Sequence, residues 1–233
     1  MKYIGLFLSG GIGSRVGGEV PKQYLSAGGR PVFSYSLKVM MEHAGIDGVR
    51  IVADSEWEGE IASALSGMDT GAKRFLGFSL PGTTRQLSIL NGLRDIVSDV
   101  SDPSETYVIV HDAARPLLSA ELLSQLISAC HGHDGALPVL PMKDTIYESM
   151  DKKTITGLLD RSTLFAGQAP EAYILDKYIA ANEALLPKDI LTVHGACEPA
   201  ISYGMDIALI PGDEKNYKIT TAEDLKKFLD ITS

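Results

Sequence analysis

The sequence has few residues that could cross-link it covalently or bind a metal through sulfur. It contains two cysteines, Cys130 and Cys197, which are too few for a disulfide framework or a cysteine zinc site. It also lacks any apolar run of the roughly 20 residues that a membrane-spanning helix needs. The apolar run after Lys2 is shorter than the central region of a secretory signal. We therefore expect a reduced, cytoplasmic protein without a membrane partner.

Lysine and arginine are also scarce. The chain has 21 of them against 30 acidic residues, which gives a net charge of −9 and a pI of about 5.0. This charge argues against a surface for nucleic acid, so we expect no nucleic-acid partner. An acidic protein that binds a polyphosphate must gather its few cations in one place.

What the sequence does contain is an alternation of short apolar runs and longer amphipathic segments. Hydrophobic residues make up 45% of 233 positions, enough for the core of one large domain over residues 1–233. A last helix is expected after Thr220, which would form a capping box with Glu223. The alternation favours an α/β fold, a mostly parallel twisted sheet with helices on both faces. The pattern predicts strands at 3–7, 48–53, 73–77, 107–111, 135–140 and 205–210, and helices at 31–44, 56–65, 86–97, 119–130, 175–185 and 195–204.

Residues 144–161 break this alternation. Their pattern predicts two short strands around a polar turn at 151–153. We interpret about 141–163 as a β-hairpin arm that protrudes from the main body. Because an isolated hairpin is only marginally stable in water, we expect the arm to pack on another surface, for which a second subunit is a candidate.

A glycine-rich stretch from Leu8 to Leu25, LSGGIGSRVGGEVPKQYL, follows the first predicted strand. Glycines let backbone N–H groups approach a polyanion closely, and Arg15 and Lys22 add positive charge. The stretch is not a dinucleotide fingerprint, because Val16 replaces its third glycine. Nor is it a P-loop, because Glu19 stands where the lysine is required. We favour a phosphate-binding loop of another kind over the alternative, a surface turn without a ligand.

Ligands of open parallel sheets bind at the carboxyl ends of the strands. Besides the glycine-rich stretch, three segments meet this condition: PGTTRQLSILN at 81–91, VHDAARP at 110–116, and the segment around Lys218. Together with Arg161 of the arm, these segments supply the cations that an acidic chain must concentrate, namely Arg15, Lys22, Arg85, Arg115, Arg161 and Lys218.

The motifs GGxGxR, PKQYL, GxxRxxS, VHDAARP, DT, LDRS, QxP and NYKITTAEDL follow one another along nearly the whole chain. In this order the sequence resembles the cytidylyltransferases of 2-C-methyl-D-erythritol 4-phosphate and D-ribitol 5-phosphate. The resemblance implies a GT-A-like nucleotidyltransferase fold, a homodimer joined through the arm, and Mg²⁺ as the activating metal. It also implies that a polyol phosphate attacks the α-phosphorus of CTP and that pyrophosphate leaves.

The resemblance also assigns roles to single residues. Arg15 and Lys22 are implied to be catalytic, since they would stabilise charge at the α-phosphate. Mg²⁺ is expected to be held mainly by the triphosphate, with Asp112 as the candidate protein ligand. The implied nucleotide site consists of Ser9, Gly10, Gly11, Gly13, Gly82, Arg85, Ser88, Asp112 and Ala113. The implied acceptor site consists of Asp112, Arg115, Thr145, Arg161 and Lys218, of which Thr145 and Arg161 would serve the partner's site.

Besides a small change at Leu8-Ser9, where Ala-Ala or Leu-Ala is more usual, the sequence departs from the family pattern at three places. Thr83 stands where an acidic residue is usual, Ala169 replaces a threonine, and His194-Gly195 replaces Thr-Asp. The last two changes remove polar groups on the acceptor side, where a hydrogen bond to a hydroxyl would discriminate strongly. The acceptor therefore stays open between the two polyol phosphates and another alditol phosphate. Further alternatives are an enzyme of this fold that uses another NTP or a sugar 1-phosphate, and a non-catalytic CTP-binding regulator.

Overall fold

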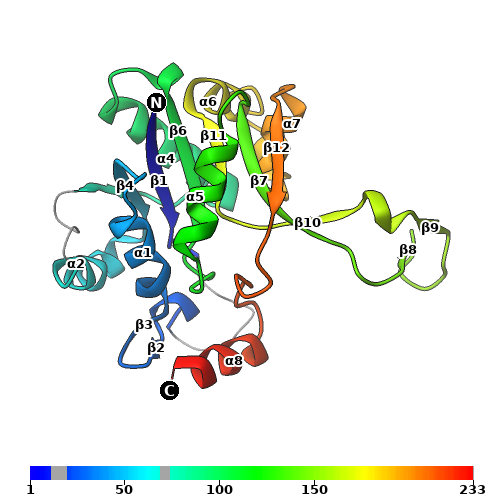
Figure 1. The fold of residues 1–233 in the computed structure, drawn as a ribbon, viewed down its shortest axis with the longest axis horizontal. Coiled ribbons are helices and arrows are strands. Elements are labelled where there is room, and N and C mark those ends of the chain that lie inside the picture. Colours follow the sequence, from blue (N-terminus) through cyan, green and yellow to red (C-terminus); the bar gives the residue numbers. More distant parts are fainter. Residues whose placement is uncertain (12–19, 69–73, 233) are drawn as a thin grey trace.

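A twisted sheet at the centre of the fold positions the rest of the chain. The computed structural model describes residues 1–11, 20–68 and 74–232. Within these residues, eight strands form the sheet in the order β10-β7-β11-β6-β1-β4-β5, with β12 beside β7 (Figure 1). The strands are β1 Lys2–Leu8, β4 Gly48–Val52, β5 Phe75–Ser79, β6 Thr106–Asp112, β7 Gly135–Pro141, β10 Phe165–Gly167, β11 Glu171–Ile174 and β12 Ile207–Pro211.

The strands at the centre of the sheet run parallel and end together. β1 pairs in parallel with β4 and β6, so that Leu8 lies beside both Val52 and Asp112. β5 continues the parallel order beside β4, and β12 runs parallel to β7. β10 and β11 are antiparallel to their neighbours. The expected mostly parallel sheet is confirmed, and its carboxyl ends form one common edge.

Helices cover both faces of the sheet, as expected. On one face, Gly92 of α4 packs so closely on Leu6 of β1 that an added Cβ would lie 2.4 Å from its side chain. On the other face, Met40 of α1 packs against Gly5 of the same strand. On the first face α6 contacts both α4 and α7, whereas α5 packs on β7 and β12. The helices are α1 Val32–Glu42, α2 Glu58–Ser66, α4 Arg85–Asp99, α5 Ala120–Ala129, α6 Leu175–Glu183, α7 Cys197–Ser202 and α8 Ala222–Thr232.

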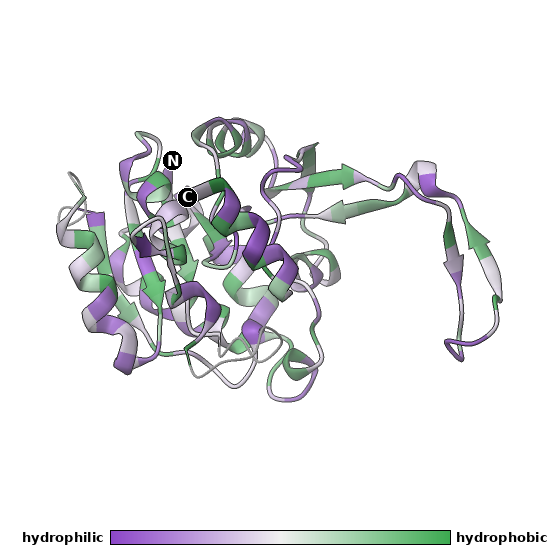
Figure 2. Cartoon of the chain, turned by 90° about the horizontal axis from the view of Figure 1, so that it is seen from below, coloured by the Kyte–Doolittle hydropathy of each residue, from purple (hydrophilic) through white to green (hydrophobic). Residues whose placement is uncertain are grey.

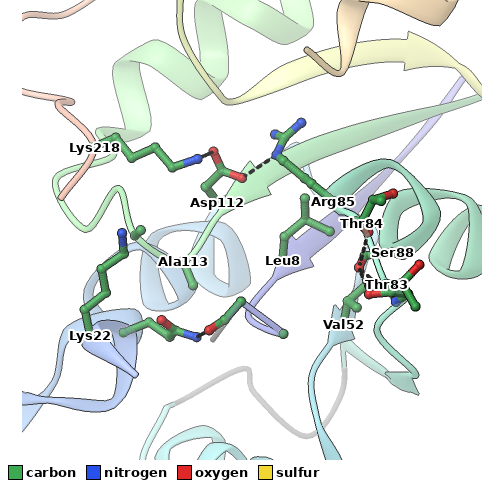
Figure 3. Close-up of a pocket in the computed structure, with 15 residues that line it drawn as sticks. Leu8, Lys22, Val52, Thr83, Thr84, Arg85, Ser88, Asp112, Ala113 and Lys218 are labelled. Carbon is green, nitrogen blue, oxygen red and sulfur yellow. Dashed lines mark hydrogen bonds and ion pairs between the residues drawn. The ribbon is translucent and has the colours of Figure 1, made fainter. Parts of the chain in front are cut away.

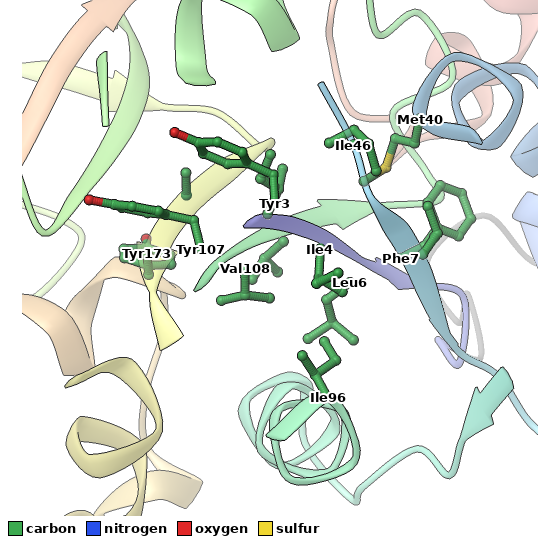
Figure 4. Packing of buried hydrophobic residues seen from close by; sticks show 14 of the residues in the cluster. Tyr3, Ile4, Leu6, Phe7, Met40, Ile46, Ile96, Tyr107, Val108 and Tyr173 are labelled. Carbon is green, nitrogen blue, oxygen red and sulfur yellow. The ribbon is translucent and has the colours of Figure 1, made fainter. Parts of the chain in front are cut away.

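The main core lies between the sheet and these helices. Because side chains of a strand alternate between its faces, Leu6 points toward Ile96 of α4 while Phe7 lies on the side of Met40 (Figure 4). Both side chains are at most 1% exposed, and burying each stabilises the fold by about 1.5–3 kcal/mol. All residues of β6 are buried, which explains the apolar run at 107–110, while the polar residues Thr106, His111 and Asp112 lie toward its two ends.

A second, smaller core holds the last helix against the segment that follows the glycine-rich stretch. Phe228 of α8 is fully buried with Ala27, Val32 and Ile219. Ala27 belongs to a short hairpin of β2 Ser26–Ala27 and β3 Arg30–Pro31, which follows the 3-10 helix η1 Lys22–Tyr24. This packing joins α8 to residues 27–32 beside the carboxyl edge of the sheet.

The cap of α8 lies one residue later than the sequence predicts. Thr221 Oγ1 accepts a hydrogen bond from Asp224 N at 3.1 Å, and Asp224 Oδ2 accepts one from Thr221 N at 2.8 Å. The expected pair of Thr220 and Glu223 is therefore wrong. Asp224 also accepts hydrogen bonds from the backbone and hydroxyl of Thr220, both at 2.8 Å, which explains why the shorter acid is favoured here.

The expected hairpin is present and protrudes from the body (Figures 1 and 2). It consists of β8 Ile146–Glu148 and β9 Gly157–Leu159, paired antiparallel. Apolar side chains are exposed along it, among them Tyr147 at 58%, Met150 at 82% and Leu158 at 67%. Exposed apolar side chains in such a row are typical of a surface that another molecule covers.

The sequence prediction missed β10 and β11, which bring the chain back from the arm into the sheet. Their segment contains Gly167 and Pro170 and looks like a loop, but its pairing partners β6 and β7 lie far away in the sequence. The predicted strand at 73–77 is observed two residues later, as β5, and Lys73 lies outside the described residues. In the described part of the chain, none of the helices has the length and apolar character needed to cross a membrane.

Candidate active site

A cavity of about 570 Å³ opens at the carboxyl ends of β1, β4 and β6 (Figure 3). This is the edge at which the sequence places its ligand-binding segments. Cavities of roughly 300–1,000 Å³ are typical of small-molecule and cofactor sites. Its lining comes from segments far apart in the sequence: Leu8, Gly10, Gly11, Lys22, Gln23, Val52, Gly82, Thr83, Thr84, Arg85, Ser88, Asp112, Ala113, Ala114 and Lys218.

The start of the glycine-rich stretch forms one wall of the cavity. Gly10 and Gly11 line it, and an added Cβ at Gly10 would lie 2.6 Å from Cβ of Pro81. Gly10 is therefore needed because two loops touch there. Ser9 is buried behind this wall, where its hydroxyl contacts the Tyr24 hydroxyl at 2.9 Å. Of the other predicted residues of this stretch, Gly13 and Arg15 lie outside the described residues.

Gln23 holds this wall in place. Its side-chain amide donates hydrogen bonds to the carbonyl oxygens of Ser9 at 2.8 Å and Gly11 at 2.6 Å. Gln23 is not among the site residues expected from the sequence, although its position beside Lys22 in PKQYL was a usable signal. An amide can bridge two carbonyl groups that would otherwise point apart, so this residue fixes the path of the loop.

Lys22 lines the cavity from the opposite side. It is the first residue of η1 and is only 8% exposed, which is unusual for a lysine. The neighbouring Tyr24 stacks on Trp57, with ring centroids 4.1 Å apart and planes 11° apart. This stack supports the short helix that carries Lys22.

The amino end of α4 forms the third wall. Thr84 caps the helix by accepting a hydrogen bond from Leu87 N at 3.2 Å, and Ser88 Oγ accepts one from Gly82 N at 2.9 Å. An added Cβ at Gly82 would lie 2.4 Å from Cβ of Leu87, so this loop tolerates only glycine without a shift. The positive end of a helix dipole at the cavity favours anions there.

Four side chains of alternating charge form a row beside the cavity. Lys218 Nζ lies 2.8 Å from Asp112 Oδ2, and Arg85 Nε lies 3.0 Å from Asp112 Oδ1 (Figure 3). The other end of Arg85 lies 3.7 Å from Glu171 Oε1, while Glu171 Oε2 accepts a hydrogen bond from the Tyr173 hydroxyl at 2.6 Å. Both oxygens of Asp112 are thus bonded to cations that belong to different parts of the chain.

The surroundings shift the pKa values of these groups in a consistent way. Burial alone would raise the pKa of Asp112, but the charges of Arg85 and Lys218 outweigh it and hold that pKa well below its usual range. Burial alone would lower the pKa of Arg85, yet Asp112 and Glu171 raise it. Burial raises the pKa of Glu171 and is only partly offset by Arg85. Asp112 is therefore ionised at neutral pH.

Glu171 is a second residue that the sequence analysis missed. A carboxylate in the otherwise apolar strand EAYI was the available signal, because buried carboxylates are rare unless they are paired. Glu171 does not line the cavity.

Arg115 lies behind the cavity. One of its guanidinium NH groups donates a hydrogen bond to the carbonyl oxygen of Asn216 at 2.8 Å, so it contacts the segment that carries Lys218. Its backbone carbonyl accepts a hydrogen bond from the buried His111 Nε2 at 3.1 Å. A direct contact of Arg115 with an acceptor stays a prediction.

Among the predicted site residues that the structure describes, Thr145 and Arg161 lie away from the cavity. Both are exposed on the arm, and Arg161 donates a hydrogen bond to the carbonyl oxygen of Lys143 at 2.6 Å. The structure thus brings together the remaining described site residues but not these two. Their expected role in a partner's site stays a prediction.

The side chains that line the cavity could bind Mg²⁺ only if phosphate oxygens and water supplied most of its ligands. Among the described residues, no group of three or more His, Cys, Asp or Glu side chains could hold a metal ion. Asp112 is the one carboxylate among the described residues that line the cavity. A single carboxylate suits an ion that takes most of its ligands from phosphate oxygens and water, as Mg²⁺ does.

These features define the class of the protein: an α/β nucleotidyltransferase-like fold with a cation-lined cavity at the carboxyl ends of its parallel strands. Comparison with known families then gives the particular family. Residues 5–229 match the family described as IspD, 2-C-methyl-D-erythritol 4-phosphate cytidylyltransferase, and the chain belongs to this family.

Known relatives agree with this assignment. The chain is 32% identical over 229 residues to the 2-C-methyl-D-erythritol 4-phosphate cytidylyltransferase of Neorickettsia sennetsu, covering 97% of this chain and 94% of the relative. It is also 32% identical over 234 residues to the bifunctional enzyme IspD/IspF of Rhodospirillum rubrum. That alignment covers 97% of this chain but 56% of the relative, so the chain spans about half the length of such bifunctional relatives.

Solved structures agree on the fold. The 4-diphosphocytidyl-2C-methyl-D-erythritol synthase of Anaerococcus prevotii superposes with a TM-score of 0.83 at 24% identity, covering 99% of this chain and 95% of that one. The cytidylyltransferase (IspD) of Francisella tularensis superposes with a TM-score of 0.79 at 19% identity, over the full length of both chains. At these identities the likeness concerns the fold alone.

Proposed function

We propose that this chain is a CTP-dependent cytidylyltransferase that transfers CMP to a polyol phosphate, with 2-C-methyl-D-erythritol 4-phosphate as the first candidate acceptor. The observation that carries the proposal is the convergence of Lys22 and Lys218, from opposite ends of an acidic chain, on one cavity beside Asp112. The family match supports the choice of nucleotide and acceptor.

The proposed reaction joins two phosphate esters. A phosphate oxygen of the acceptor attacks the α-phosphorus of CTP, a new P–O bond forms, and the bond to pyrophosphate breaks. The attacking phosphate is already anionic, so no strong general base is required. Catalysis then consists of aligning two anions and neutralising their charge.

The residues of the cavity can be assigned to these tasks. Lys22, together with Arg15 of the glycine-rich stretch, would stabilise the charge that develops at the α-phosphate. Gly10, Gly11 and the amino end of α4 would hold the nucleotide through backbone N–H groups. Lys218 would bind the acceptor phosphate.

Mg²⁺ is the proposed metal. Among the described residues, Asp112 would be its protein ligand, and the bound ion would neutralise triphosphate charge. Asp112 itself is kept ionised and fixed in orientation by Arg85 and Lys218. The homodimer joined through the arm and the cytoplasmic location are proposed from the sequence alone.

The test is pyrophosphate release from each of the four NTPs with Mg²⁺ and a panel of alditol phosphates, followed by detection of the nucleotide-linked product. We expect product with CTP and 2-C-methyl-D-erythritol 4-phosphate. Product only with D-ribitol 5-phosphate, another NTP or a sugar 1-phosphate would replace the proposed substrate. Binding of CTP without product from any acceptor would support the non-catalytic regulator instead.

A further inference from the structure

The segment 212–218 carries Lys218 at its end and lies across the base of the arm. We refer to it as the lysine segment. It follows β12 and is bordered by Gln168 and Ala169, which directly follow β10. The arm and the lysine segment are far apart in the sequence, yet several contacts join them.

Gln168 holds the beginning of the lysine segment. Its side-chain amide donates to the carbonyl oxygen of Asp213 at 3.0 Å and accepts a hydrogen bond from Asp213 N, also at 3.0 Å. Gln168 is only 5% exposed, so these bonds are shielded from water. An added Cβ at Gly212 would lie 2.5 Å from Gln168 Oε1, so the backbone at Gly212 lies close against the side chain of Gln168.

Asn216 holds the end of the same segment, two residues before Lys218. It is fully buried, and its side-chain Nδ2 donates a hydrogen bond to the carbonyl oxygen of Ala169 at 2.7 Å. Its own carbonyl oxygen accepts the bond from Arg115. One side chain therefore ties the lysine segment to the base of the arm while its backbone is tied to the loop after β6.

A further contact is exposed and weaker. Lys143, at the start of the arm, forms an ion pair with Glu214, and both side chains are well over half exposed. Such surface pairs contribute little to stability. The buried hydrogen bonds of Gln168 and Asn216 are therefore the contacts that matter.

Lysine has a long, flexible side chain, so the position of its ammonium group depends on how firmly the backbone below it is held. Directly after Lys218, Ile219 N donates a hydrogen bond to the carbonyl oxygen of Ala114 at 2.8 Å. This bond fixes one side of Lys218, and Gln168 and Asn216 fix the other. We infer that Gln168 and Asn216 are positioning residues, which place the Lys218 ammonium beside Asp112 by holding the lysine segment on the base of the arm.

This inference rests on the proposed function, in which Lys218 binds the acceptor phosphate. It predicts that loss of the Gln168 or Asn216 side chain weakens binding of the acceptor but not of CTP. Without either side chain the backbone below Lys218 is held less firmly, so its ammonium group can move. A side chain that only stabilised the fold would lower the amount of folded enzyme, which changes the apparent kcat but neither KM.

The experiment compares Asn216→Ala and Gln168→Met with Asn182→Ala. Asn182 is an equally buried asparagine outside the lysine segment: its side-chain Nδ2 donates to the carbonyl oxygen of Tyr178 at 2.8 Å, on α6, and its Oδ1 accepts a hydrogen bond from Gln86 of α4. For the two test variants we expect the KM of the polyol phosphate to rise about tenfold. This is the change expected when the displaced Lys218 loses one hydrogen bond to the acceptor phosphate. The KM of CTP should stay within about threefold. Asn182→Ala should lower Tm and leave both KM values unchanged.

A second variant at the same position sharpens the test. Gln168→Glu keeps an acceptor for Asp213 N but sets a buried carboxylate against the carbonyl oxygen of Asp213, which repels it, so its KM for the polyol phosphate should be at least as high as that of Gln168→Met. It also keeps the test decisive if Asn216→Ala fails to fold. Equal KM values in wild type and folded variants, or parallel changes in the KM of both substrates, would overturn the inference while the proposed function stands. A wild-type enzyme that makes no product would overturn the proposed function, and the inference with it.

Discussion

The ammonium group of Lys218 lies 2.8 Å from Asp112 Oδ2, although 106 residues separate the two in the sequence. An acceptor phosphate that binds Lys218 must compete with Asp112 for this cation. Arg85 continues to hold the other oxygen of Asp112, so the carboxylate keeps its orientation when Lys218 turns to the phosphate. In the proposed function, Lys218 would exchange Asp112 for the acceptor phosphate while Arg85 keeps the carboxylate paired.

Lys218→Met should weaken acceptor binding, because it removes the charge and keeps most of the side-chain length. We expect kcat/KM for the polyol phosphate to fall by about 10²-fold, as is usual when one charged contact is lost. Steady-state kinetics with the acceptor varied at saturating CTP measures this. Lys215→Met is the matched control, since Lys215 is exposed in the same segment. Equal losses in both variants would contradict the assignment.

Lys22→Ala should act on the chemical step. Removal of one group that stabilises the transition state usually costs at least about 10²-fold in kcat, and we expect the same for Arg15→Ala. Single-turnover measurements separate this effect from product release. Lys188→Ala, at an exposed position, serves as the control. Turnover like that of the wild type in either test variant would rule out its catalytic role.

Gly82→Ala should push its loop away from the amino end of α4. The new Cβ would lie 2.4 Å from Cβ and 2.8 Å from the carbonyl carbon of Leu87, and the second of these contacts is with backbone. Overpacking of this kind costs about 1–3 kcal/mol of stability. We expect a lower Tm and a higher KM for CTP. Gly59→Ala should do neither, because Gly59 lies in α2 with open space around it.

Stability should fall below neutral pH because of His111. Burial lowers the pKa of this fully buried imidazole from 6.5 to about 4, so the unfolded chain binds more protons between these values. The free energy of unfolding should therefore decrease as the pH falls from about 6.5 to 4, by up to about 1.4 kcal/mol per pH unit. Urea unfolding at pH 7 and pH 5 measures the difference.

His111→Asn removes this titrating group and should flatten that pH dependence, whereas His131→Asn at an exposed turn should not. An unchanged dependence in His111→Asn would mean that other groups account for it.

Deletion of the arm should separate the proposed subunits. With residues 143–162 replaced by a short glycine linker, we expect monomers with little activity, since Thr145 and Arg161 would no longer reach a partner's site. Light scattering gives the mass, and the pyrophosphate assay gives the activity. Lys153→Ala, at the exposed tip of the arm, should preserve both. A fully active monomer would refute the shared site.

The sequence predicts those parts of the fold that depend on local patterns. The parallel strands around β1 and the helices between them follow from hydrophobic periodicity, and the arm follows from the break in that pattern. β10 and β11 could not be predicted, because their pairing with β7 and β6 is decided by distant parts of the chain. The predicted cap of α8 was one residue too early, because two threonines and two acidic residues within 220–224 offer alternative capping pairs.

The residues of the candidate site, too, were only partly predictable from the sequence. Glycines and cations at strand ends could be found from residue type and position alone. The roles of Gln23 and Glu171 could not, because each acts through a neighbour, Gln23 on the backbone of Gly11 and Glu171 on Arg85. Such contacts are visible only once the chain is folded.

The stack of Tyr24 on Trp57 gives this protein a natural optical reporter. The chain has a single tryptophan, so its indole emission can be assigned without mutagenesis. Tyr24 directly follows Gln23 and contacts Ser9, so a ligand that shifts the wall of the cavity also changes the surroundings of the indole. Titration of nucleotide into the unlabelled protein, monitored by fluorescence, can therefore follow occupancy in real time.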